Sequence, residues 1–300
     1  MMPTNFDDVV FDAKSHTYKI GDQSLFPVTS IVKWLTPEFR SDEVLESKAI
    51  SSGRSKEDIQ ADWDAKRDAG LAKGTKVHAY IENVIEGIDQ RISMSINDHL
   101  YEMKEFDKAW GRMCSNLSAS LDRKEWTVGD SELGVAGRVD ALLWIKQDSE
   151  KKRCLFDWKT GKFMVRKYAR ESMLPPFDDL PCCEEIKYSI QLSLYRLIIE
   201  RNLNESLHGG FILHLADGYP YNVYNVIDLR DRLEKWLLSM RVSGALGDPE
   251  ADKQALRTAK SLDVIDESQL KILSPQTRKR LLNRAAKLLQ RGKPYFKEQS

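Results

Sequence analysis

The segment from residue 123 to residue 160 constrains the fold of this chain more than any other. Apolar and polar residues alternate there in two runs, at about residues 123–145 and 153–160, whereas helical spacing prevails on both sides. The polar segment KQDSEKKR, at residues 146–153, separates the two runs. Because alternation with a period of two is typical of strands and a short polar segment is typical of a turn, this region predicts a β-hairpin.

The remaining sequence predicts strands and helices around this hairpin. Further strands are expected at the N-terminus and at residues 209–217 and 221–229, and a mobile loop at the charged, Ser-rich residues 38–73. Helices are expected at residues 31–35, 74–87, about 96–120, 185–202, 230–240 and through the last 50 residues. We therefore expect an α/β fold with a mixed, mainly antiparallel central sheet flanked by helices, and helical N- and C-terminal elements. The expected domains are residues 1–245 and a helical, basic extension at residues 246–300.

Composition excludes some classes of protein and does not bear on others. The 46 basic residues balance the 46 acidic residues, so the net charge gives no indication of a nucleic-acid partner. There is no apolar run of roughly 18 residues and no apolar signal core. We expect no membrane partner and a cytoplasmic location, in the host cytoplasm if the protein is viral. Reduced thiols are expected at all four cysteines, which are Cys114, Cys154, Cys182 and Cys183.

Three charged residues can converge on one face of the predicted hairpin. Asp157 and Lys159 share a face of the second strand, since alternate side chains point the same way. If Asp140 on the first strand lies opposite Lys159, the two carboxylates and the ammonium form a single patch. A register shifted by one residue would send Asp140 to the other face of the hairpin.

Such a patch has a chemical interpretation and a structural one. Two neighbouring carboxylates repel each other unless a cation lies between them, and hard oxygen ligands suit Mg²⁺ or Mn²⁺. A cation of this kind can activate water and polarise a phosphodiester, while Lys159 stabilises developing charge. The alternative is an exposed hairpin with a stabilising Asp–Lys pair, because D-x-K alone is a weak pattern.

The sequence also resembles a known family. Gly137–Asp140 followed by Asp157–Lys159 is similar to the G-x-x-D and D-x-K core of PD-(D/E)XK nucleases, in particular the RecB-like group and phage exonucleases. Gly74–His78 resembles the upstream G-x-x-x-H element, and Gln191–Tyr195 the downstream Q-x-x-x-Y element. Glu125 matches, less specifically, an acidic position often found before the first catalytic aspartate. The resemblance spans about residues 16–226.

This resemblance implies a restriction-endonuclease-like core and a set of roles. Asp140, Asp157 and Lys159 would be catalytic, and His78 would join the two aspartates in binding Mg²⁺ or Mn²⁺. Gln191 and Tyr195 would contact DNA. The second acidic position is aspartate here rather than the commoner glutamate. No iron–sulfur cluster is expected, because the last cysteine precedes the Q-x-x-x-Y element instead of following it.

Several of these residues have ordinary structural alternatives. His78 could be a half-buried helix residue, although its place in the motif favours a metal ligand. Glu82 lies one helical turn further on and could touch a metal-bound water, but a solvated surface position is the simpler interpretation. Gln191 and Tyr195 lie four residues apart and could form buried packing with a hydroxyl at its rim, or bind phosphates and stack on a base.

Basic residues gather in two places. One cluster follows the D-x-K motif and comprises Lys159, Lys162, Arg166, Lys167 and Arg170. The other lies on a helix expected between Ser274 and Gly292. The apolar face of this helix should dock on the body through Leu281, Leu282, Ala285, Leu288 and Leu289. Although charge runs are usually solvated faces, we expect its basic face to contact the DNA backbone, through Arg280, Arg284, Lys287 and Arg291.

Together, these features predict a metal-dependent deoxyribonuclease. An exonuclease acting on DNA with free ends, single- or double-stranded, in recombination, repair or processing is expected from the RecB-like resemblance. A structure- or branch-specific endonuclease of the same chemistry is the first alternative. A DNA-binding module that keeps the fold without catalysis is the second.

Overall fold

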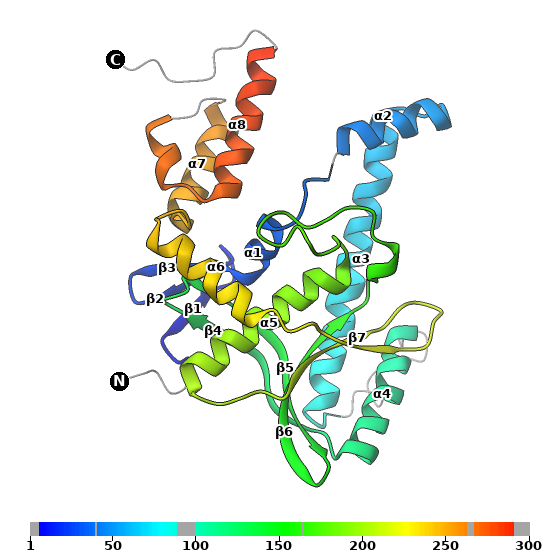
Figure 1. Ribbon diagram of the computed structural model, residues 1–300. Coiled ribbons are helices and arrows are strands. Elements are labelled where there is room, and N and C mark those ends of the chain that lie inside the picture. Colours follow the sequence, from blue (N-terminus) through cyan, green and yellow to red (C-terminus); the bar gives the residue numbers. More distant parts are fainter. Residues whose placement is uncertain (1–5, 40, 89–99, 164, 263–266, 291–300) are drawn as a thin grey trace.

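The fold is organised around one mixed sheet with helices on both faces (Figure 1). The computed structural model describes residues 6–39, 41–88, 100–163, 165–262 and 267–290. Most neighbouring strands are antiparallel, and two pairs are parallel. The expected α/β class and its mainly antiparallel central sheet are confirmed. No described helix is long and apolar enough to cross a membrane.

The sheet has eight strands in the order β1-β2-β3-β5-β6-β7-β8, with β4 paired to β5 outside this path. An N-terminal meander forms β1, β2 and β3. The β5–β6 hairpin forms the centre of the sheet, with β4 paired to β5, and β7 and β8 follow beyond β6. Their bounds are Val9–Asp12 (β1), Thr17–Ile20 (β2), Gln23–Pro27 (β3), Ser120–Asp130 (β4), Val135–Gln147 (β5), Glu150–Lys159 (β6), Gly209–His214 (β7) and Asn222–Asn225 (β8).

The predicted central hairpin is β5–β6, and its register differs from expectation by two residues. Ala141 lies opposite Phe156, and Gln147 lies opposite Glu150. The turn is shorter than residues 146–153 because Asp148 and Ser149, with φ of 50° and 68°, form a tight two-residue connection. The polar residues around it therefore extend the strands. A shift of two residues preserves the faces, so Asp140 and Asp157 still share one side of the hairpin.

Two apolar cores cover the two faces of the sheet. One lies under α1 (Val28–Trp34), α5 (Glu184–Leu203) and α6 (Arg230–Val242). The other lies under α3 (Lys56–Ile85) and α4 (Tyr101–Leu117). Strand β5 alternates between them, with Leu142 in the first core and Leu143 in the second. The period-two pattern of this strand is therefore explained by burial on both faces.

The loop predicted at residues 38–73 is wrong. This stretch holds α2 (Ser41–Ser52) and the first half of α3. Ser55 caps α3 by accepting a hydrogen bond from the Asp58 backbone N–H at 3.0 Å, and acidic residues occupy the first turn. Few of the residues in this half of α3 are buried, so the apolar periodicity that normally identifies a helix is missing.

The C-terminal helices form a small unit with its own apolar cluster. It contains α7 (Pro249–Leu262), a 3-10 segment η4 (Glu267–Ile272) and α8 (Pro275–Gln290). Ser274 begins α8 as expected, because its hydroxyl accepts the Thr277 N–H at 3.4 Å. Leu281 and Ala285 are buried, but Leu282, expected to dock, is 44% exposed. The expected end at Gly292 lies outside the described residues, and the domain boundary after residue 245 stays a prediction.

Candidate metal centre

The candidate site lies at a gap along one edge of β5. Strand β4 pairs with nearly the whole length of β5 on the opposite edge. On this edge, β3 pairs only with Val135 and Ala136, and β6 pairs only from Ala141 onward. Residues 137–140 therefore face a fork between β3 and β6, where β5 pairs on this edge with no strand in the part of the chain that the structure describes. Forks of this kind open space for side chains within a sheet.

Asp140 occupies the fork and takes over a backbone interaction. Its Oδ2 accepts a hydrogen bond at 3.1 Å from the backbone N–H of Trp158, beyond the point where the β5–β6 ladder ends. A side chain thus replaces the neighbouring strand as the acceptor for this N–H, which would otherwise be an unmet backbone donor. The bond fixes the Asp140 carboxylate between β5 and β6.

His78 reaches the same point from α3. Its Nε2 lies 3.0 Å from the Trp158 carbonyl oxygen, and its Nδ1 lies 3.7 Å from Asp140 Oδ2. Because a carbonyl oxygen only accepts hydrogen bonds, we assign the hydrogen to Nε2. In the neutral ring, Nδ1 then presents a lone pair to a carboxylate. Two facing acceptors are stable only with a proton or a cation between them.

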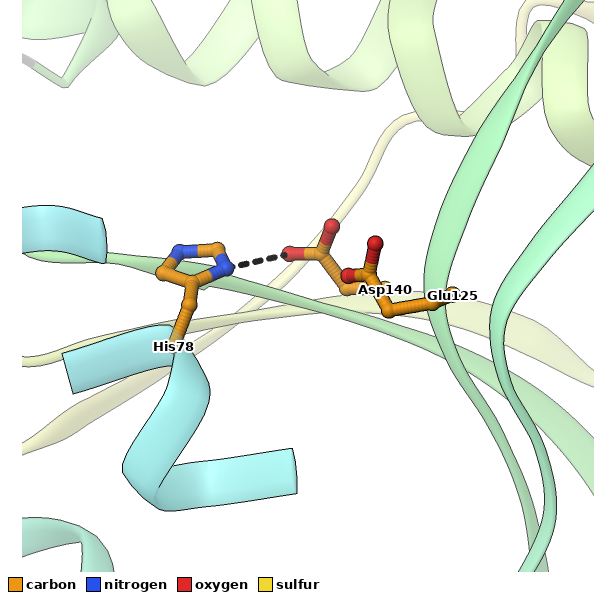
Figure 2. Close-up of side chains that lie close together, drawn as sticks. All are labelled: His78, Glu125 and Asp140. Atoms are coloured by element: carbon orange, nitrogen blue, oxygen red, sulfur yellow. Dashed lines mark ion pairs between the residues drawn. The ribbon is translucent and has the colours of Figure 1, made fainter. Parts of the chain in front are cut away.

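Glu125 completes the cluster from β4. One ligand atom each from His78, Glu125 and Asp140 lie within 4.8 Å of one another, and Figure 2 shows the three side chains converging. Glu125 has φ of 44°, a left-handed conformation that non-glycine residues rarely adopt inside a strand. Backbone strain of this kind is concentrated at functional sites. Here it occurs at the residue that brings a second carboxylate to Asp140.

The electrostatics of the cluster are unfavourable without a cation. Burial and the charge of Asp140 raise the pKa of Glu125 above its ordinary value, although an ion pair with Arg138 opposes the rise. Burial likewise raises the pKa of Asp157 to about 6, with Asp140 adding to the effect. Carboxyl groups that resist ionisation together are expected where negative charges are held close in a partly dry site.

Asp157 and Lys159 form an ion pair next to the cluster. The Lys159 ammonium contacts Asp157 Oδ2 and lies 4.8 Å from the centre of the Tyr188 ring. Burial lowers the pKa of Lys159, but the charges of Asp157 and Asp140 more than offset it and hold the pKa above its ordinary value. Lys159 is therefore a fixed cation. Asp157 Oδ2 is buried, and the Lys159 ammonium is its partner.

The donor set fits a divalent cation. The fork collects two carboxylates and an imidazole whose free nitrogen faces one of them. The buried carboxylate of Asp157, paired with Lys159, lies on the adjoining strand. Oxygen-rich sites with one imidazole suit Mg²⁺ or Mn²⁺ better than softer metals. The structure brings His78 and Asp140 together as expected, adds Glu125 to them, and places Asp157 in a pair with Lys159.

The G-x-x-D and Q-x-x-x-Y elements pack against each other through Gly137 and Tyr195. A Cβ atom on Gly137 would lie 2.6 Å from Cε1 of Tyr195, so only glycine leaves room for this ring. Tyr195 is buried, and burial raises the pKa of its hydroxyl. Gln191 Nε2 lies 3.5 Å from that hydroxyl. The ring of Tyr195 is thus enclosed by the body, which favours the packing alternative for this residue over base stacking.

The other predicted residues lie further from the cluster. Glu82 is partly exposed on α3 and lies 3.8 Å from Lys124 in an ion pair, and its charge also acts on Glu125. Arg280 lines a hollow of about 630 Å³ together with Lys33, Lys187 and Lys279. Arg284 lies on the same helix, the side chain of Lys287 is not described, and Arg291 lies outside the described residues. Contact with DNA at these positions stays a prediction.

Comparison with known proteins gives little similarity. No protein-family model matches the sequence, and no curated protein matches it. Among solved structures, the chain is similar to a candidate exonuclease from Eubacterium rectale, with 13% identity, 58% of this chain and 65% of that chain covered, and a TM-score of 0.31. It is also similar to the protein SSO0001, with 14% identity, coverages of 55% and 74%, and a TM-score of 0.24. The chain spans less than two thirds of the first of these proteins.

Proposed function

We propose that this protein is a metal-dependent nuclease that hydrolyses phosphodiester bonds in DNA. One observation carries the proposal: ligand atoms of His78, Glu125 and Asp140 lie within 4.8 Å of one another at the fork, beside the ion pair of the buried Asp157 with the partly exposed Lys159. Carboxylates around a cation, with a fixed ammonium next to them, form a site suited to a phosphate group and to the charge that develops on it.

Each residue has a role in the proposed reaction. His78, Glu125 and Asp140 would hold Mg²⁺ or Mn²⁺, and the carboxylate of Asp157 on the adjoining strand would join them. When bound, the cation makes water a stronger nucleophile and neutralises the phosphate. Lys159 places its ammonium where negative charge increases during hydrolysis. The Trp158 carbonyl positions His78 by holding its Nε2–H.

The substrate is proposed to be DNA with free ends, processed exonucleolytically in recombination, repair or processing. Gln191 is half-exposed at the fork and is proposed to contact the strand. The basic face of α8, with Arg280, Arg284, Lys287 and the following Arg291, is proposed to hold the phosphate backbone. Arg280 lines the same hollow as Lys187, which lies in the first turn of α5.

A cleavage assay tests this function. End-labelled linear DNA, single- and double-stranded, is incubated with the full chain and Mg²⁺ or Mn²⁺, with and without chelator. We expect cleavage that chelator abolishes and that Asp140→Asn reduces below detection, whereas Asp148→Asn, in the exposed β5–β6 turn, cleaves normally. A closed circular substrate distinguishes the modes, because an exonuclease leaves it intact. Binding without cleavage by the wild type would contradict the proposal and indicate a non-catalytic module.

A further inference from the structure

The segment that follows Lys159 has an unusual composition. Between Thr160 and Arg170 there are four basic residues and no acidic residue, with Phe163 and Tyr168 interspersed. On α3, by contrast, charges of opposite sign are mixed and paired: Arg67 contacts Asp64, and Asp62 contacts Arg54 just before the helix. A basic segment interrupted by aromatic residues is typical of surfaces that bind single-stranded nucleic acid.

The segment is fixed to the body at two points. Phe163 stacks on Tyr224 with ring centres 4.3 Å apart and also contacts Tyr188 at 5.8 Å. Three residues later, Arg166 Nε lies 2.8 Å from Glu185 Oε1, and its backbone N–H donates to Glu185 Oε2 at 2.9 Å. These anchors hold the segment against the first turns of α5. Its outer side chains therefore have a defined position relative to the site.

The anchors leave one aromatic ring and three cations facing solvent. Tyr168 is 63% exposed, and the Lys167 ammonium lies 4.8 Å from its ring centre. Lys162, Lys167 and Arg170 are also exposed, and none of them has an ion pair with another of the residues that the structure describes. An exposed tyrosine flanked by unpaired cations offers a stacking surface and phosphate contacts at the same place.

The inner anchor connects this surface to the candidate metal centre. The Tyr188 ring contacts Phe163 on the segment and Lys159 in the site. Because the centre itself is rich in carboxylates, a polyanionic substrate needs compensating positive charge nearby. The exposed cations after Lys159 supply it within a few residues of the catalytic strand.

We propose that Lys162, Lys167, Tyr168 and Arg170 form a platform that binds an unpaired DNA strand, with a base stacked on Tyr168 and phosphates held by the three cations. This inference rests on the proposed function and specifies its substrate as single-stranded DNA or an unpaired end. Bases inside a duplex are covered by their neighbours and cannot stack on a side chain, so the platform selects against intact duplex.

Binding measured in chelator tests the platform without requiring cleavage. The full chain is titrated into a fluorescent single strand, a blunt duplex and a single strand of abasic sites. Tyr168→Ala should weaken binding of the normal single strand about 10-fold or more, because the variant has no aromatic ring on which a base can stack. The same variant should leave the duplex and the abasic strand unchanged, and Tyr168→Phe should bind like the wild type. Tyr219→Ala, which removes another exposed tyrosine, is the matched control.

The salt dependence of DNA binding tests the role of the platform's cations. Replacing Lys162 and Lys167 with glutamine should lower the log–log salt slope for a single strand by about 0.7 for each phosphate that the protein no longer neutralises. Equal reductions of affinity for normal and abasic strands in Tyr168→Ala, or an unchanged slope, would overturn the platform. Tyr168-dependent binding by a protein that never cleaves would keep the platform and overturn the nuclease function. Cleavage by the wild type, with no effect of Tyr168→Ala on binding, would keep the nuclease function and overturn the platform.

Discussion

The two ends of the β5–β6 hairpin are built by the same strands but follow different rules. Near the turn, each residue from Ala141 to Gln147 has a partner on β6, and the side chains fill both cores. At the other end the ladder stops, a carboxylate accepts the Trp158 N–H, and charged groups take the place of apolar ones. We call the paired end near the turn the closed end and the unpaired end the open end. Strand pairing stabilises the closed end, whereas the open end lacks these pairs and holds the candidate metal ligands.

This difference separates what stabilises the fold from what performs the proposed chemistry. At the open end, Glu125 adopts a left-handed backbone and Asp157 is buried in an ion pair with Lys159. The strained backbone costs stability, and so does the burial of the Asp157 carboxylate, a cost that the ion pair offsets only in part. Natural proteins commonly accept such costs at functional sites. Substitutions at the closed end should therefore change stability, and substitutions at the open end should mainly change activity.

The largest expected effect comes from the ammonium at the open end. Lys159→Met should reduce turnover about 100-fold or more, because developing negative charge loses its fixed cation. Lys146→Met makes the same substitution at an exposed position of the closed end and should leave turnover unchanged. Steady-state cleavage rates at saturating Mn²⁺ measure both. Equal rates in the two variants would show that Lys159 is only a partner for Asp157.

The next effect concerns stability and pH. Burial raises the pKa of Asp157 to about 6 in the folded, metal-free protein, whereas an unfolded chain has about 3.9. The folded state therefore binds this proton more tightly. The stabilisation of the folded state by this proton is complete below about pH 4 and is lost as the pH rises through about 6. The loss is about 2 to 3 kcal/mol.

Denaturant unfolding in chelator between pH 4 and pH 7 measures this dependence. Asp157→Asn cannot ionise, so the difference in unfolding free energy between variant and wild type should grow in the variant's favour over that range. Asp148→Asn, in the exposed turn, is the control. Parallel curves for Asp157→Asn and the wild type would mean that Asp157 is already ionised throughout.

A smaller effect is expected at Gly137. An added methyl group would collide with the buried Tyr195 ring, and overpacking of this kind costs about 1 to 3 kcal/mol. Gly111→Ala, on α4 with no atom near the added methyl, should instead be neutral or stabilising. Thermal and denaturant unfolding distinguish the two. If Gly137→Ala were as stable as Gly111→Ala, the contact between the two motifs would not constrain the fork.

The sequence predicted the closed end of the hairpin better than the open end. Alternation identified the strands because burial follows a period of two. The register was displaced by two residues, since nothing in a polar run distinguishes its tight turn at Asp148 and Ser149 from the strand ends on either side. His78 and Asp140 were predicted to converge, and they do. The metal-binding roles themselves remain predictions.

Other parts of the site were only partly indicated by the chain. Glu125 matched an acidic position of the family that the sequence resembles, but its approach to Asp140 depends on an unusual backbone conformation on β4, which neither propensity nor spacing encodes. Tyr188 lies one turn before Gln191 on α5 and contacts Lys159, and the spacing of residues along the chain does not predict this contact. The first half of α3 lacked an apolar stripe, and the signal that could have identified it was the cap at Ser55 with Asp58.

Titration of Mn²⁺ into the full chain, followed by calorimetry or by the electron paramagnetic resonance of free Mn²⁺, tests the cation site at the open end most directly. The wild type should bind Mn²⁺. Glu125→Gln and His78→Gln should each weaken binding by about 10-fold or more. Glu82→Gln, a neighbouring acid paired with Lys124, should bind like the wild type. Unchanged Mn²⁺ affinity in Glu125→Gln and His78→Gln, or no binding by the wild type, would contradict a metal centre at this fork.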